Sequence, residues 1–114
     1  MQLNTYLLEG ATVVEVIGRI DTYSEKVLRE GLLNICATAP TNLVIDLDGV
    51  NFIDSSGLAA LVHGLRACRA TGGNLCLASP QRPVRMILEL TRLDTSIDIF
   101  PTTAEACSSL AQLC

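Results

Sequence analysis

The 114-residue sequence predicts a single α/β domain over residues 1–114, with a mixed, mostly parallel β-sheet and about four helices packed on it. Short β-branched or apolar runs alternate with stretches of helical periodicity, in the order ββαβαβαβα. The run from Leu43 to Leu47 is almost wholly apolar, which is typical of a parallel strand covered on both faces. Turn signals such as Gly72-Gly73 and Ser79-Pro80 separate the segments.

The first third of the chain predicts two strands and a helix. Residues 5–8 and 12–17 are separated by Glu9-Gly10 and are expected to pair as a hairpin. Thr22 and Glu25 have the spacing of a capping box, in which each side chain accepts a free backbone N–H. We therefore expect a helix over about residues 23–37, with its buried face formed by Leu28, Leu32 and Ile35.

The rest of the chain predicts three helices and two strands after the buried strand. A helix is expected from Leu58 to about Ala70, with His63 on its exposed face and a buried stripe formed by Leu58, Leu61, Val62, Leu65 and Cys68. Residues 75–78 and 97–100 are the expected strands. Pro83 fits the first turn of the third helix, whose buried face is Val84, Ile87 and Leu88. The last helix starts near Thr102, with Ala106, Leu110 and Leu113 facing the core.

Composition excludes several classes of function. The net charge is −4 and the eight basic residues are scattered, so neither nucleic acid nor an anionic membrane is an expected partner. No apolar run is long enough to span a bilayer, and the start lacks the basic region of a secretory signal, which favours a cytoplasmic protein. We expect a monomer. Five cysteines without C-x-x-C spacing and one histidine predict no metal site and mostly reduced, buried thiols.

Catalytic chemistry is not expected either. The sequence contains no glycine-rich phosphate loop and suggests no cofactor. His63 lies seven residues after Ser56 on one predicted helix, about 10.5 Å away, whereas a general base must be within about 3 Å of its nucleophile. Asp46 and Asp48 would share one face of a strand, but no third ligand is arranged with them. We therefore predict that the protein is not an enzyme.

The most distinctive stretch is Asp54-Ser55-Ser56-Gly57, between the apolar strand and the second helix. Either Asp54 or Ser55 is suited to cap that helix, and capping alone would account for one of them. If Asp54 or Ser55 caps the helix, Ser56 lies in the first turn with its hydroxyl free. Gly57 then leaves the approach to that hydroxyl uncrowded. A phosphate on Ser56 would be favoured by the helix dipole while adding nearly two negative charges to a docking surface.

The stretch from Leu43 to Leu58, containing Ile53-Asp54-Ser55-Ser56-Gly57-Leu58, resembles the signature of STAS domains, in particular the bacterial anti-sigma-factor antagonists. The resemblance covers nearly the whole chain. Gly18-Arg19-Ile20-Asp21 is similar to the family's Gly-x-Leu-Asp, and Gly72-Gly73-Asn74-Leu75 is similar to its glycine pair before a strand.

The resemblance implies a small regulatory switch without catalytic activity. Its dephosphorylated form would bind an anti-sigma factor that is also a serine kinase of the histidine-kinase-like ATPase fold, and so release a sigma factor. That kinase would phosphorylate Ser56, and a PP2C-type phosphatase would reverse the reaction. The family positions matched by Asp21, Asp54, Ser55, Ser56 and Gly57 would form the partner-binding surface.

The chain departs from the family pattern at one helix end, and the family resemblance allows a second function. Where relatives often have glycine after the third helix, this chain has Thr91-Arg92-Leu93, and arginine is poorly suited to a left-handed helix end. The family resemblance also allows an alternative function, a ligand-binding or scaffolding subunit of a transporter or sensory complex. In that case the two serines would only cap the helix.

Overall fold

The sheet contains five strands in the order β1-β2-β3-β4-β5, as seen in a computed structural model that describes residues 1–37 and 40–112. Strand β1 pairs antiparallel with β2, and every later pair is parallel. The predicted mixed, mostly parallel sheet is confirmed. The strands are β1 (Gln2–Leu8), β2 (Ala11–Ile20), β3 (Asn42–Ile53), β4 (Asn74–Ala78) and β5 (Ile99–Phe100).

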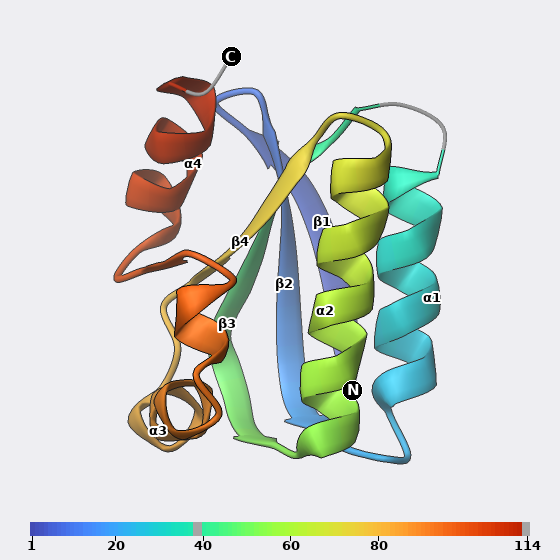
Figure 1. Ribbon diagram of the computed structural model, residues 1–114, viewed down its shortest axis with the longest axis vertical. Coiled ribbons are helices and arrows are strands. Elements are labelled where there is room, and N and C mark those ends of the chain that lie inside the picture. The colour runs from blue at the N-terminus through green and yellow to red at the C-terminus, as the bar shows by residue number, and fades with distance from the viewer. Residues whose placement is uncertain (38–39, 113–114) are drawn as a thin grey trace.

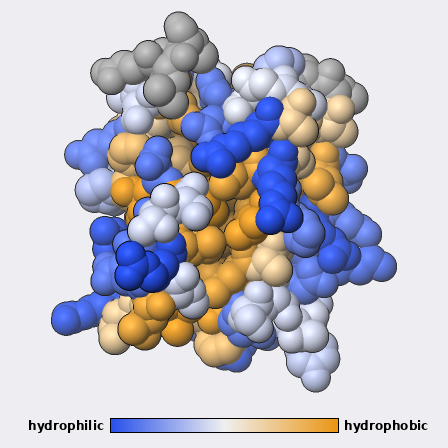
Figure 2. All heavy atoms as spheres, in the orientation of Figure 1, coloured by the Kyte–Doolittle hydropathy of each residue, from blue (hydrophilic) through white to orange (hydrophobic). Residues whose placement is uncertain are grey.

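Helices cover both faces of the sheet (Figure 1). One core contains the buried residues of α1 (Glu25–Cys36), α2 (Ser55–Ala70) and α3 (Arg82–Leu90). A second, smaller core on the other face contains those of α4 (Thr103–Gln112). Figure 2 shows apolar atoms in the middle of the viewed face with polar atoms around them. The predicted element order is confirmed, although Leu113 lies outside the described residues.

Strand β3 is longer than predicted, because it continues from the apolar run through Asp48-Gly49 to Ile53. Asp48-Gly49 is a turn signal in the sequence, but here Gly49 pairs with Ile17 and Val50 with Gly18 of β2. The register shifts at this point, as expected where one strand carries an extra residue. Pairing with β2 therefore outweighs the local turn preference and extends the strand to the start of α2.

The start of α1 differs from the predicted capping box. The helix begins at Glu25, and its N-cap residue Ser24 makes no side-chain cap hydrogen bond. Instead, Asp21 Oδ1 accepts the N–H groups of Tyr23 and Ser24 at 3.0 and 3.2 Å. Because Asp21 satisfies these donors, the hydroxyl of Thr22 is available for another contact.

The end of α3 requires a left-handed residue. Thr91 caps the helix, its hydroxyl donating to the Ile87 carbonyl at 2.7 Å. Arg92 then adopts φ 61° and ψ 22°, and a short 3₁₀ helix, η1 (Leu93–Thr95), follows. The chain thus uses arginine in a conformation that glycine adopts at lower cost.

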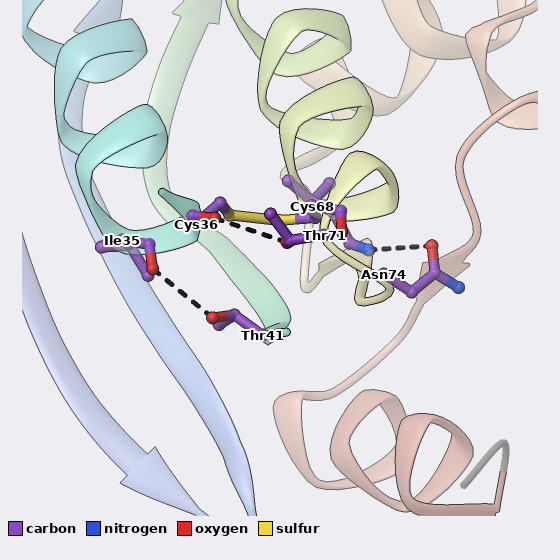
Figure 3. Close-up of a disulfide and its surroundings, with 7 residues drawn as sticks. Ile35, Cys36, Thr41, Cys68, Thr71 and Asn74 are labelled. Atoms are coloured by element: carbon purple, nitrogen blue, oxygen red, sulfur yellow. Dashed lines mark hydrogen bonds between the residues drawn. A yellow bond between two sulfur atoms is a disulfide. The ribbon is translucent and has the colours of Figure 1, made fainter. Parts of the chain in front are cut away.

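Two of the cysteines are not the reduced thiols that we predicted. Cys36, at the end of α1, and Cys68, in the last turn of α2, form a disulfide (Figure 3), with their Cα atoms 5.2 Å apart. The Thr71 hydroxyl donates to the carbonyl oxygens of both cysteines, at 3.4 and 3.2 Å. The helical periodicity of the two segments did not predict that the ends of these helices would lie side by side.

The other described cysteines, Cys76 and Cys107, are buried free thiols, as predicted. Burial, with smaller effects of Cys107 and Asp98, raises the pKa of Cys76 to about 12, so this group stays neutral. Cys114 lies outside the described residues. None of the described helices is long and apolar enough to cross a membrane.

Candidate functional site

The site forms where two parallel strands end side by side. Ile20, the last residue of β2, pairs with Ile53, the last residue of β3, and the Asp54 N–H donates to the Ile20 carbonyl at 3.1 Å. An aspartate follows each isoleucine, and a helix follows each aspartate. The N-termini of α1 and α2 consequently lie next to each other at one end of the sheet (Figure 1).

Asp54 is the N-cap of α2. Its Oδ1 accepts the Gly57 N–H at 3.1 Å, and its carbonyl oxygen accepts the Leu58 N–H at 3.0 Å. Ser55 and Ser56 are therefore the first two residues of the helix, as expected if the aspartate provides the cap. The Ser55 side chain is exposed, whereas Ser56 is half-buried but still reaches the surface.

The Ser56 hydroxyl is not free, which corrects the sequence-based expectation. Its Oγ lies 3.3 Å from Oγ1 of Thr22, in the turn between β2 and α1, and either hydroxyl can donate. Thr22 was predicted to cap α1, but Ser24 is the N-cap residue and Asp21 accepts the N–H groups of the turn that precedes the helix. The hydroxyl pair therefore joins the two strand-to-helix junctions across 34 residues of sequence.

Asp21, the residue before Thr22, is held in a fixed geometry by several hydrogen bonds. Its carboxylate accepts from the Ser24 hydroxyl at 3.3 Å and from Nε of Arg19 at 3.5 Å, in addition to two backbone N–H groups. Burial is the largest single influence and acts to raise the pKa of Asp21. The hydrogen bonds from Ser24, Tyr23 and Arg19 together outweigh it and lower that pKa, so the carboxylate remains charged.

Arg19 ties the junction to the neighbouring strand. Its guanidinium lies 4.1 Å from the centre of the Phe52 ring, in addition to its ion pair with Asp21. Such cation–π contacts stabilise an exposed pair by about 0.5–1 kcal/mol. Arg19 therefore brings one positive charge to the edge of the site.

Gly57 has a different role from the one predicted. It is buried, and a Cβ atom there would lie 2.6 Å from Cγ2 of Ile20 and 2.8 Å from the Ile20 carbonyl oxygen. Glycine therefore allows the first turn of α2 to approach the end of β2 closely. This close packing brings Ser56 next to Thr22. Gly57 is buried, so it does not serve to leave the outer approach to Ser56 uncrowded.

The structure brings the five predicted site residues, Asp21, Asp54, Ser55, Ser56 and Gly57, to one end of the sheet. His63 is exposed farther along α2, and no hydrogen bond joins it to Ser56 in the described part of the chain. The surface presents hydroxyls and carboxylates that hydrogen bonds hold in place.

Thr22 and Arg19 are the residues that the sequence-based prediction did not place in the site. A signal for Thr22 was present, because Ile20-Asp21-Thr22 and Ile53-Asp54-Ser55 repeat the same order of residue types. If two parallel strands end in register, the residues after them become neighbours. Arg19 gave no such signal, since its contact with Phe52 depends on the pairing of β2 with β3.

Comparisons with known proteins agree on one family. Residues 2–106 match the family model described as "STAS domain". The chain is 35% identical over 91 residues to the anti-sigma-B factor antagonist of Bacillus subtilis, covering 80% of this chain and 83% of that protein.

Two solved structures have the same fold. An anti-sigma factor antagonist from Mycobacterium paratuberculosis has a TM-score of 0.86 and 28% identity, over 96% of this chain and 93% of that one. The Bacillus protein SpoIIAA in its phosphorylated form has a TM-score of 0.71 and 17% identity, over 95% and 98%, which shows the fold alone. The sheet, the Asp-Ser-Ser-Gly junction and these matches agree, and the chain belongs to the STAS domain family.

Proposed function

We propose that this protein is an anti-sigma-factor antagonist whose binding is switched by phosphorylation of Ser56. In this proposal the dephosphorylated form binds an anti-sigma factor with serine kinase activity in the cytoplasm and thereby releases a sigma factor. A PP2C-type phosphatase restores the binding form. The protein itself would catalyse no reaction. The names of its relatives, which are anti-sigma factor antagonists, support this class of partner.

The observation that carries the proposal is the position of Ser56. It lies in the first turn of a helix that Asp54 already caps, so its hydroxyl is not needed to hold the helix. A phosphate here would lie near the unpaired N–H groups of that turn, which favour an anion. It would also bring about two negative charges to a surface that already contains Asp21 and Asp54.

Phosphorylation should therefore change binding more than folding. A docked partner must desolvate the junction, and an added dianion makes that desolvation costly. The half-exposed hydroxyl does not pack into the core, so the fold tolerates the phosphate. We expect the melting temperature of the phosphoprotein to differ little from that of the unmodified protein.

Binding to the anti-sigma-factor kinase tests the proposal. The kinase is first isolated with Ser56→Ala protein as bait in the presence of ATP, and its Kd is then measured for four forms of the chain. Wild type and Ser56→Ala should bind equally without ATP, whereas authentic Ser56 phosphoprotein and Ser56→Asp should bind at least tenfold more weakly. A fifth form, Ser55→Ala, is the matched control, and phosphorylation of its Ser56 should weaken binding by the same factor as in wild type.

Equal affinity of the unmodified and Ser56-phosphorylated chains would reject the proposal. Stable recovery in a transporter or sensory complex, without Ser56 phosphate under any growth condition, would instead favour the scaffolding function.

A further inference from the structure

We propose that the part of the sheet face beside α4 that no helix covers is a docking surface for a second copy of this chain. Helix α4 lies on the opposite side of the sheet from α1 and α2 (Figure 1). It packs against residues near the start of β2 and β3 and against β4, while the later halves of β2 and β3 have no helix on that side among the described residues. We call this area the open face; its side chains are Asn4, Glu15, Ile17, Arg19, Asp46 and Phe52.

Strand pairing and side-chain contacts place these residues on one surface. Glu15 pairs with Asp46 of β3, and its Oε1 accepts a hydrogen bond from the side-chain amide of Asn4 in β1 at 3.1 Å. The Arg19 guanidinium lies over the ring of Phe52. Ile17 lies between Glu15 and Arg19 in β2, at alternate positions that point away from the core beneath α1 and α2. The open face therefore crosses three neighbouring strands.

The centre of the open face is apolar and exposed. Ile17 and Phe52 are 38% and 37% exposed, although both lie in paired strands. Gly49 pairs with Ile17 and has no side chain, so Ile17 is left uncovered on the side of β3. Apolar and aromatic residues flanked by arginine are typical of the central part of a protein–protein interface.

The open face has an acidic end and a basic end. Glu15 and Asp46 lie side by side, and no lysine or arginine pairs with either in the described part of the chain. Burial, followed by the negative charges of Asp48 and Glu15, raises the pKa of Asp46, so a cation is missing at this end. Arg19 lies four residues farther along β2, about 13 Å from Glu15. Asp21 accepts from Nε of Arg19, which leaves the two terminal amino groups of the guanidinium for another carboxylate.

These charges decide how two open faces can pack. A two-fold dimer of sheet faces can align its two β2 strands in the same direction or in opposite directions. In the same direction, Arg19 would face the partner subunit's Arg19, so like charges would meet. In opposite directions, with Ile17 at the two-fold axis, each Arg19 faces the partner subunit's Glu15, and the partner subunit's Asp46 lies beside that glutamate. The opposite alignment therefore joins unlike charges on both sides of an apolar centre.

The size of the open face makes this a weak, reversible dimer. Three strands and about five residues of each give an area of roughly 14 by 16 Å, well below the ~800 Å² per partner of a standard interface. The chain would therefore be the expected monomer when dilute and a dimer when concentrated. Since α1 and α2 lie on the other side of the sheet, the hydroxyl pair of Thr22 and Ser56 stays outside the interface. The dimer is thus compatible with the proposed function and does not depend on it.

Small-angle X-ray scattering across a concentration series tests the inference with charge-reversal variants. Wild type should dimerise with a Kd between roughly 10 µM and 1 mM. Arg19→Glu and Glu15→Arg should each weaken association roughly fivefold or more, because each homodimer then brings two pairs of like charges together. An equimolar mixture of the two variants should recover the wild-type affinity, since both contacts of the heterodimer join opposite charges. Arg66→Glu and Glu30→Arg, on the exposed surfaces of α2 and α1, are the matched controls and should behave like wild type.

Three results would overturn the inference. Wild type that stays monomeric up to about 1 mM would leave the open face to a different protein. A dimer that Arg19→Glu and Glu15→Arg do not weaken would show that the two copies meet elsewhere. Weakened variants that gain nothing on mixing would exclude the pairing of Arg19 with Glu15. If either charge variant does not fold, Ile17→Asp gives a second test, because it places two carboxylates at the two-fold axis and should abolish association; unchanged association would also overturn the inference.

Discussion

Gly57 is the residue on which the geometry of the site most directly depends. A Cβ atom there would meet the Ile20 carbonyl oxygen at 2.8 Å, and a backbone atom cannot move away without shifting the end of β2. We expect Gly57→Ala to lower the free energy of unfolding by about 1–3 kcal/mol, more than the ~1 kcal/mol that alanine gains in helix propensity. Urea unfolding measures this difference.

Gly31 provides the control for that experiment. It also lies within a helix, but its added Cβ would meet only the side-chain tip of Leu3, at 3.1 Å. Gly31→Ala should therefore be neutral or slightly stabilising. If Gly57→Ala were as stable as Gly31→Ala, the close approach of α2 to β2 would not require glycine.

Asp46 gives the molecule a pH dependence that can be measured. Burial, followed by the negative charges of Asp48 and Glu15, raises the pKa of Asp46 despite a hydrogen bond from the Asp48 N–H. The folded state therefore prefers the protonated carboxyl, and its contribution to stability is lost as the pH rises through the raised pKa. Asp46→Asn should be more stable than wild type at pH 7.

That gain should shrink as the pH falls towards and below 3.8, the ordinary value for this carboxyl, where wild-type Asp46 is protonated as well. Thermal melts between pH 3 and pH 8 measure the trend. Asp94→Asn, which removes an exposed negative charge elsewhere, controls for net charge. A gain of the same size at every pH would contradict the argument.

At the scale of elements, the end of α3 is held by a residue in an unfavourable conformation. Arg92 is left-handed, which costs a residue with a Cβ about 1–2 kcal/mol, and glycine avoids that cost but loses more chain entropy on folding. Arg92→Gly should therefore stabilise the protein by about 0.5–1 kcal/mol. Arg92→Ala keeps the Cβ atom and should give no gain, and equal stability of the two variants would show that the backbone conformation is not the cause.

At the scale of the whole molecule, the Cys36–Cys68 disulfide encloses β3, the junction and most of α2. The two cysteines are 32 residues apart, for which the chain-entropy model gives a stabilisation of about 3–4 kcal/mol. Reductant should therefore lower the melting temperature by roughly 10 °C or more. A Cys36→Ser/Cys68→Ser variant should not respond to reductant, and an unchanged wild-type melting temperature would refute the stabilising role.

The fold class and most of the element order could be predicted from the sequence because they depend on local patterns. The apolar run of Leu43 to Leu47, the helical stripe from Leu58 to Cys68 and the polar cluster at Asp54 are each visible within one segment. The residues after the strand ends could also be assigned to a site by resemblance. These signals reflect hydrophobic periodicity and capping, which a segment expresses without its neighbours.

Only the tertiary structure decided how separate segments meet. Pairing with β2 extends β3 through a turn signal. Asp21, and not Thr22, accepts the N–H groups of the turn before α1, and the Thr22 hydroxyl contacts Ser56. The Cys36–Cys68 bond and the inward role of Gly57 are likewise contacts between elements. All of these contacts have the same physical cause. Each depends on the distance between residues far apart in sequence, and sheet register and helix packing set that distance rather than local preference.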